Sequence, residues 1–213
     1  MKVVDLTHTI QNGMPVYPGC EGPTLLPANS HDTDGFRETS LCLLSHTGTH
    51  IDAPAHVFPD GKTLDAFPPE HFIGEGIVLD CTTLKPGKPI SVRDMKRLHD
   101  GLDGAEYVLF HTGWSDRWGS PAYFEGYPCI DEKAADYLLE SGKKGIGFDA
   151  PSVDPVADAE LPLHKHLLAG DAFLIVENLT NLEALIGESF TFCALPLKYE
   201  GADGAPVRAL AII

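Results

Sequence analysis

The stretch Ser45–His56, SHTGTHIDAPAH, holds three histidines and an aspartate, although the whole chain of 213 residues contains only 10 histidines. His50 and Asp52 are two residues apart, a spacing that puts both side chains on one face of an extended segment. Gly48 allows the backbone to bend so that His46 can join them. Imidazole nitrogens beside a carboxylate oxygen suit Zn²⁺, Mn²⁺ or Fe²⁺. We therefore predict a metal site here, with a turn that binds nothing as the alternative.

A helical metalloprotease motif is the first rival to this interpretation, because His46 and His50 are four residues apart. The residues between them, Thr47, Gly48 and Thr49, disfavour a helix, and the glutamate of the HExxH motif is missing. A strand that leads into a loop fits the sequence better. Such a loop seldom supplies a whole metal site, so further ligands are expected far along the chain.

The second candidate segment is LPLHKHLLAGDAFLIVENL, in which two histidines precede an apolar run that ends at Glu177. A carboxylate at the end of an apolar strand is costly unless it is paired or bound to metal. Either His164 or His166 could accompany it. A helix-capping or surface role for Glu177 remains the simpler alternative.

Apolar runs bounded by turn residues predict the elements that must position these groups. Helices are expected after Ser91, with Asp94 completing a capping box, and after Asp131, and a short one after Thr180 or Asn181. Two apolar arms around 201–204 predict a C-terminal hairpin. Mostly buried strands are expected in segments 2–7, 38–45, 76–82, 106–113, 145–150 and 172–179. The pattern indicates an α/β fold with a mixed sheet in a single domain, residues 1–213.

The composition limits the kinds of partner and the compartment that we expect for this protein. The chain carries 15 Lys and Arg against 31 Asp and Glu, a net charge of −16, which disfavours nucleic acid as a partner. Its five cysteines include no close pair, so no disulfide framework is expected and a reducing compartment fits. The N-terminus lacks the apolar run of a signal peptide, and no stretch approaches the length of a membrane span. We expect a cytoplasmic protein that acts on a small molecule away from membranes.

The segment HTGTHIDAPAH resembles the signature of the metal-dependent cyclase-type hydrolases, a family that includes bacterial kynurenine formamidases and isatin hydrolases. The opening DLTHTIQNGMPVYPG, the middle GFDAPSVD and the later HKHLL and IVENLTNLEAL also resemble this family, in the same order. The resemblance implies a swivelling β/β/α domain, assembled as a homodimer or homotetramer. It also implies one or two divalent metal ions per chain, zinc or manganese.

The resemblance assigns five positions to metal binding. His46, His50 and Asp52 would hold the first ion, and Asp52 would bridge to a second ion that His164 and Glu177 complete. His164 is preferred because the family pattern is histidine, two residues and then Leu-Leu.

His56 matches the proposed catalytic histidine of the family. A metal-activated water would attack an amide or formamide carbonyl while His56 transfers a proton to the departing nitrogen. The family's kynurenine formamidases carry a Trp-Pro-Gly-Asp-like stretch, where this chain has Tyr17 and Cys20 in VYPGC. The substrate therefore stays open between an aryl formamide such as N-formylkynurenine, a cyclic amide or imide, and a lactone-like ester. A cyclase or lyase and a non-catalytic metal-binding module are the alternatives to a hydrolase.

Overall fold

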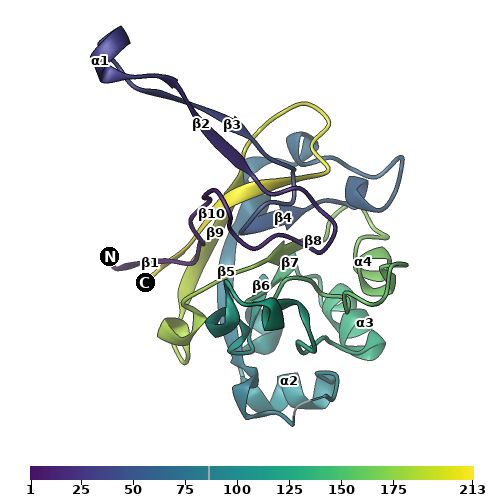
Figure 1. Ribbon diagram of the computed structural model, residues 1–213. Helices are drawn as coiled ribbons and strands as arrows, with labels where there is room; N and C mark the ends of the chain where they lie inside the picture. The colour runs from purple at the N-terminus through teal and green to yellow at the C-terminus, as the bar shows by residue number, and fades with distance from the viewer. Residues whose placement is uncertain (86) are drawn as a thin grey trace.

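The computed structural model describes residues 1–85 and 87–213 (Figure 1). Its strands are β1 Val3–Asp5, β2 Thr24–Asn29, β3 Glu38–Cys42, β4 His50–Asp52, β5 Ile73–Asp80, β6 Tyr107–His111, β7 Gly145–Phe148, β8 Leu174–Glu177, β9 Phe190–Pro196 and β10 Gly204–Ile212. Its α-helices are α1 His31–Asp34, α2 Val92–Leu98, α3 Glu132–Glu140 and α4 Pro162–Leu167.

The main sheet is mixed and closes into a barrel. Its strand order is β1-β10-β4-β8-β7-β6-β5-β9, and a further pairing of β9 with β10 closes the ring. Strands β5 to β8 run parallel to one another, whereas β4, β9 and β10 pair antiparallel. Parallel neighbours require crossover connections, and α2, α3 and α4 lie on those connections. The α/β class with a mixed sheet, predicted from the sequence, is confirmed.

Two apolar cores lie on the two faces of the barrel wall. Val108 and Phe110 of β6 point outward and pack against the helical layer, while Tyr107 and Leu109 point into the barrel. The alternation follows from the two-residue period of a strand. Figure 1 shows α2, α3 and α4 gathered on one side of the sheet. The wall is therefore rigidly packed on both sides where β6, β7 and β8 carry it.

Strands β4 and β8 lie side by side and set the candidate site. His50 pairs with Glu177, and Asp52 pairs with Ile175. The intervening Ile51 belongs to the barrel interior. By alternation, the side chains of His50, Asp52 and Glu177 face outward, toward the layer that contains α4.

The helix starts follow the predicted capping chemistry. Ser91 and Asp94 form a reciprocal capping box at α2, and the Asp131 carboxylate accepts a hydrogen bond from Ala134 N, 2.8 Å away, at α3. Helix α2 ends at Leu98. The predicted short helix is a 3₁₀ turn, Leu182–Leu185. Within the part of the chain that the structure describes, no helix has the length and apolarity needed to cross a membrane.

Two strand predictions were wrong about burial. Segment 2–7 was expected to be mostly buried, but β1 has one exposed and two partly buried residues. Segment 38–45 was expected to be buried, but every residue of β3 is exposed, and β3 pairs with β2 in a separate two-stranded sheet. Together with α1, these strands form an arm, residues 24–42, that projects from the barrel (Figure 1). Leu26 and Leu41 on this arm are 56% and 60% exposed. An apolar run predicts burial, but it does not say whether the same chain supplies the cover.

Candidate metal centre

Four buried side chains from three segments converge on the outer face of β4 and β8. His50 Nε2 lies 3.2 Å from Asp52 Oδ1 and 3.5 Å from Glu177 Oε2. His164 Nε2, on α4, lies 3.2 Å from Glu177 Oε1 and 3.6 Å from Asp52 Oδ2. None of the four side chains is more than 6% exposed. Two carboxylates and two imidazoles therefore lie together in one small buried volume.

The outer nitrogen of each of these two rings is bonded to a protein acceptor. His50 Nδ1 lies 2.8 Å from the Gly48 carbonyl oxygen, and His164 Nδ1 lies 2.7 Å from Asp154 Oδ2. Because both partners accept, each Nδ1 carries the proton and donates it. In the neutral ring, Nε2 then presents a lone pair to the carboxylates. Carboxylate–histidine pairing of this kind is what orients metal-binding histidines.

A nitrogen lone pair and a carboxylate repel each other unless a positive charge lies between them. Asp52 is the residue at which this need is clearest. Its Oδ2 is buried and has no hydrogen-bond partner among the residues that the structure describes. Burial alone would raise the pKa of Asp52, but the His50 and His46 rings hold that pKa well below its ordinary value. The carboxylate is therefore ionised, and the donor set fits a divalent cation.

The same balance acts on His164. Burial lowers the pKa of this ring, but the carboxylates of Asp154, Asp52 and Glu177 outweigh burial and raise the pKa well above its usual value. Such a ring takes up a second proton when only carboxylates surround it. A divalent cation satisfies the same carboxylates and displaces that proton.

His46 completes the cluster from the turn before β4. Its Nδ1 lies 2.6 Å from Asp52 Oδ1, and its Nε2 lies 2.9 Å from Asp203 Oδ2. Burial lowers the pKa of His46, but Asp52 and Asp203 raise it to about 10. The pKa of Asp203 is about 2, chiefly because of its hydrogen bond with His46. Gly48 has a φ of +67°, so the bend predicted between His46 and His50 is present at the expected residue.

His56 lies at the rim of the cluster on a short 3₁₀ turn, Pro54–His56. Its ring centroid is 3.9 Å from that of His46 and 5.6 Å from that of His164. Its side chain is 25% exposed. Burial is the main cause that lowers the pKa of His56, so the ring is neutral near pH 7. It can accept a proton and return it.

The structure distinguishes the two histidines of segment 161–179. His164 enters the cluster, whereas His166 Nε2 lies 2.8 Å from Asp136 Oδ1 and its side chain is 36% exposed. Sequence reasoning missed two carboxylates, Asp154 and Asp203. Asp154 ends the GFDAPSVD motif, so a signal for it existed. Asp203 stands in a loop far along the chain, with no local pattern to mark it.

Two further positions in the sequence have structural roles. Asp149 accepts hydrogen bonds from the backbone nitrogens of Thr112 and Gly113, and His111 Nδ1 lies 3.2 Å from it. Asp149 therefore ties the ends of β6 and β7 together. Such a turn-forming role was one of the two interpretations that its sequence context allowed.

His8 lies in a partly buried position close to the cluster, beside Thr49. Its ring is partly buried and stacks on Trp118 at 3.9 Å with an interplanar angle of 4°. Its backbone nitrogen donates to Thr49 Oγ1, next to His50. Burial lowers the pKa of His8 to about 4, so this ring is neutral. The polar neighbours of His8 in sequence concealed a role in packing.

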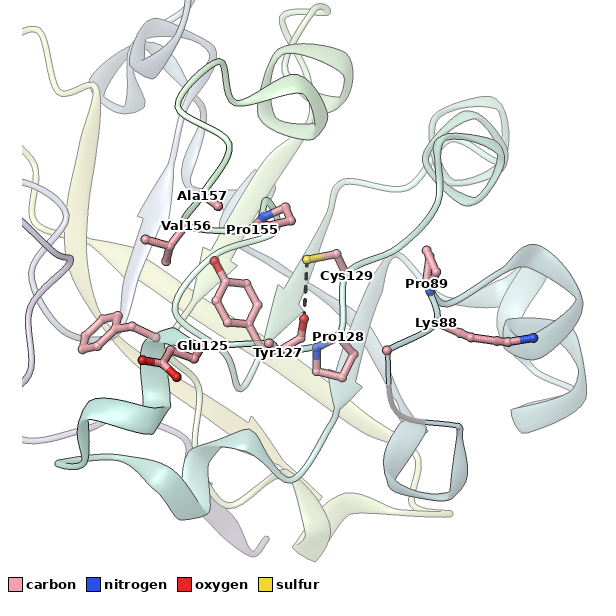
Figure 2. Close-up of a pocket in the computed structure, with 12 residues that line it drawn as sticks. Lys88, Pro89, Glu125, Tyr127, Pro128, Cys129, Pro155, Val156 and Ala157 are labelled. Atoms are coloured by element: carbon pink, nitrogen blue, oxygen red, sulfur yellow. Dashed lines mark hydrogen bonds between the residues drawn. The ribbon is translucent and has the colours of Figure 1, made fainter.

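A separate apolar pocket of about 540 Å³ opens beside the loop that carries Asp154. Figure 2 shows the Tyr127 ring directed toward Pro155 and Val156, with Cys129 on the other wall. The Tyr127 hydroxyl donates to the Asp154 carbonyl oxygen. This pocket therefore lies next to Asp154, the residue that accepts the hydrogen bond from His164. None of the residues that line the pocket belongs to the cluster of histidines and carboxylates.

Known proteins are similar to this chain in both sequence and fold. The Cyclase family model matches residues 4–155. A kynurenine formamidase of Salinibacter ruber is 34% identical, over 99% of this chain and 97% of its own length. Isatin hydrolase A of Ralstonia solanacearum superimposes with a TM-score of 0.84 at 27% identity, over 99% of this chain and 91% of the other.

A third similar protein is described as a potential metal-dependent hydrolase with cyclase activity. It has a TM-score of 0.77 and 30% identity, and the match covers 99% of this chain and 96% of that one. The family match and the near-complete coverage of the relatives agree with the motif and with the barrel. The chain belongs to the cyclase family of proteins.

Proposed function

We propose that this protein is a metal-dependent hydrolase that cleaves a carbon–nitrogen amide bond other than a peptide bond. The observation that carries the proposal is the buried cluster at β4 and β8. Its two inner imidazoles present Nε2 to the carboxylates of Asp52 and Glu177, and Asp52 Oδ2 lies there without a hydrogen-bond partner in the described ranges. An apolar protein interior tolerates such a set only when a cation completes it.

The metal would be held by residues from four segments, in one or two positions. In the described residues, three groups have ligand atoms within 4.8 Å of one another. His46, His56 and Asp203 form one that is only partly buried. The two that share Asp52 are His46, His50 and Asp52, and Asp52, His164 and Glu177. Asp52 belongs to both groups, which supports two ions that share this carboxylate. Mixed nitrogen and oxygen donors favour zinc or manganese.

A bound divalent cation supplies a hydroxide nucleophile near neutral pH and stabilises negative charge on the attacked carbonyl oxygen. The chain supplies proton transfer. His56 lies beside His46 and His164 with one side open to solvent, and its lowered pKa leaves it neutral. It accepts a proton from water and then donates it to the departing nitrogen, as general base and then general acid.

The proposed substrate class rests on the similar proteins. We propose an aryl formamide such as N-formylkynurenine, or a cyclic amide such as isatin, because the similar proteins are kynurenine formamidases and isatin hydrolases. In VYPGC, Tyr17 and Cys20 stand where the Trp-Pro-Gly-Asp-like stretch has its first and last residues. Both substrate classes therefore stay in the proposal.

The test is a product analysis with zinc- and manganese-loaded protein in ¹⁸O-labelled water. Hydrolysis of N-formylkynurenine or isatin places one labelled oxygen in the new carboxylate, and chelator-treated protein forms no product. Turnover without incorporation of label would indicate a cyclase or lyase. Metal binding without turnover of any formamide, cyclic amide or ester would indicate a metal-binding module.

We also propose that the protein assembles as a homodimer or homotetramer. The arm supports this: a two-stranded sheet is marginal by itself in water, and this one exposes Leu26, Phe36 and Leu41. A second copy of the chain would cover these side chains. Light scattering after size exclusion measures the mass directly and should give two or four chains.

A cytoplasmic location is part of the same proposal. All five cysteines are free thiols, and Cys20 and Cys42 are exposed. Exposed free thiols persist in a reducing compartment, which supports this location. Fractionation of cells that produce the protein would test it.

A further inference from the structure

His46 is turned the opposite way from the other two clustered histidines. His50 and His164 use Nδ1 for an outer acceptor and present Nε2 to the centre, whereas His46 presents Nδ1 to Asp52, 2.6 Å away. Its outer nitrogen is therefore Nε2. The outer acceptor is Asp203 Oδ2, at 2.9 Å. Asp203 therefore accepts a hydrogen bond from the outer nitrogen of His46, as the Gly48 carbonyl oxygen and Asp154 do from the other two rings.

Asp203 is itself held in place by the parts of the chain that surround the cluster. Its backbone oxygen accepts a hydrogen bond from Ala53 N at 3.0 Å, directly after Asp52. Its carboxylate accepts a hydrogen bond from Ser45 Oγ at 3.2 Å, and the Tyr199 hydroxyl, which donates to the Gly204 carbonyl oxygen, lies 3.4 Å from its other oxygen. A carboxylate with fixed backbone and fixed oxygens can define the direction of the ring that it binds.

The next residue shows how closely this segment fits His46. Gly204 pairs with Asp52 across β10 and β4. A Cβ at Gly204 would lie 2.4 Å from His46 Cε1 and 2.8 Å from Nε2. The start of β10 therefore needs glycine so that the ring can lie against the backbone while the Asp203 carboxylate meets Nε2.

The same carboxylate oxygen also faces His56. His56 Nδ1 is 4.0 Å from Asp203 Oδ2, and the His56 and His46 rings are tilted by 39° with centroids 3.9 Å apart. Asp203 thus lies at the edge of two neighbouring imidazoles, one in the proposed metal set and one in the proposed proton-transfer role.

We propose that Asp203 is a positioning residue that fixes the His46 ring with Nδ1 toward the metal centre and keeps the His56 ring beside it. The inference rests on the proposed function for the identity of the centre. The outer partners of metal-binding histidines typically change metal affinity or activity about 10- to 100-fold when they are removed. We expect a loss of that size, confined to the binding step that uses His46.

The test is a zinc titration of metal-free protein against a competing chelator, with Asp203→Ala, Asp203→Asn and the wild type. The control is Glu200→Gln, which removes a charge from the same loop. Asp203→Ala should weaken one zinc-binding step about 10- to 100-fold and leave the other within about twofold. Asp203→Asn should fall between, because its amide oxygen still accepts from Nε2–H. Glu200→Gln should match the wild type.

A spectroscopic measurement separates positioning from general support of the fold. NMR of protein labelled with ¹⁵N-histidine should show a slowly exchanging Nε2–H for His46, with or without zinc. This signal should be lost in Asp203→Ala while the His164 Nδ1–H remains. Wild-type zinc affinity and an unchanged His46 signal in Asp203→Ala would overturn the inference. An equal loss in both binding steps together with a lower melting temperature would also overturn it.

The two proposals fail in different ways. If the wild type binds no divalent metal, the proposed function fails. The His46 signal in the metal-free protein then decides the role of Asp203 alone. If the wild type binds metal and turns over substrate but Asp203→Ala binds zinc equally well, only the positioning role is wrong.

Discussion

The outer face of β4 and β8 and the arm at residues 24–42 depart from ordinary burial in opposite ways. The first buries His50, Asp52 and Glu177, with no side chain more than 6% exposed. The second exposes Leu26 and Leu41, at 56% and 60%. Buried charge and exposed apolar surface are both costly in a folded chain, and both mark places where something binds. We propose that the two binding events differ in kind: a cation in one region and a second copy of the chain in the other.

The two regions also differ in how they are supported. Each clustered histidine has an outer acceptor, and the strands beneath it are packed on both faces of the barrel wall. The arm has only the β2–β3 ladder and one short helix. A site that must hold ligand atoms in place needs the first kind of support. A surface that adapts to a partner can use the second.

The largest effect is expected from His56→Ala, which tests whether the buried region performs chemistry. Turnover should fall about 10²- to 10⁴-fold while the metal content stays that of the wild type, because His56 moves protons and lies outside the two ligand groups that share Asp52, its own group with His46 and Asp203 being only partly buried. Steady-state kinetics and metal analysis on one preparation check this. His166→Ala, a surface histidine paired with Asp136, is the control and should keep full activity. Unchanged turnover in His56→Ala would remove the residue from the mechanism.

The same substitution in the two regions compares their packing directly. Leu109 is fully buried in the barrel and Leu41 is exposed on the arm. Leu109→Ala should lower the free energy of unfolding by about 2–5 kcal/mol, because it leaves a cavity. Leu41→Ala should change it by no more than about 0.5 kcal/mol in dilute protein. Urea unfolding measures both, and a large cost at Leu41 in the monomer would show that the arm packs on its own barrel.

Charge on the arm should separate the copies and leave each barrel folded. Leu26→Asp combined with Leu41→Asp would place two carboxylates in the proposed interface, raising the dissociation constant at least about 30-fold. Light scattering should then report a single chain, with the circular dichroism spectrum of the wild type. Glu38→Gln on the same arm is the control. A double variant with the mass of the wild type would exclude the arm as an interface.

The smallest predicted effect concerns His8, whose pKa is lowered to about 4 by burial from an ordinary value of 6.5. The unfolded chain protonates this ring below pH 6.5 and the folded chain does not. The contribution of His8 to stability is therefore constant above pH 6.5 and falls as the pH drops toward 4. After a discount for the solvent that reaches the ring, His8 should account for about 1 kcal/mol of the stability lost between pH 7 and pH 5.

The measurement is the free energy of unfolding of the wild type and His8→Phe at both pH values. Phenylalanine keeps the stacking on Trp118 and cannot take a proton, so the variant should lose less stability on acidification. His31→Gln, on the exposed arm, should lose as much as the wild type. Equal losses in all three proteins would show that His8 is not held neutral.

Local spacing predicted that the side chains at β4 converge, because strands have a simple period. His50 and Asp52 share a face, Gly48 bends the chain, and Glu177 ends a buried strand, all of which are readable from neighbouring residues. Asp203 lies 157 positions from its partner His46 and has no such neighbours. Only the closure of the barrel by β10 brings it near. Long-range closure is not encoded in any short window.

The burial of β3 was mispredicted for a different reason. Its apolar pattern indicates a covered strand, but composition carries no information on whether cover comes from the same chain or another. His8 shows the converse, since polar neighbours in sequence hid a ring that stacks on Trp118. The fold class, the capped helices and the C-terminal hairpin were predictable because each depends on residues close in sequence.

The most direct test of the account is the amount of divalent metal per chain, measured by plasma mass spectrometry on protein purified without chelator. Asp52→Ala is compared with the wild type, and Asp136→Ala is the control for the loss of a carboxylate paired with a histidine. Asp52 belongs to both ligand groups, so the account predicts about two equivalents in the wild type and nearly none in Asp52→Ala. Asp136→Ala should keep the metal. No metal in the wild type, even after incubation with Zn²⁺ or Mn²⁺, would contradict the metal centre and the proposed hydrolase with it.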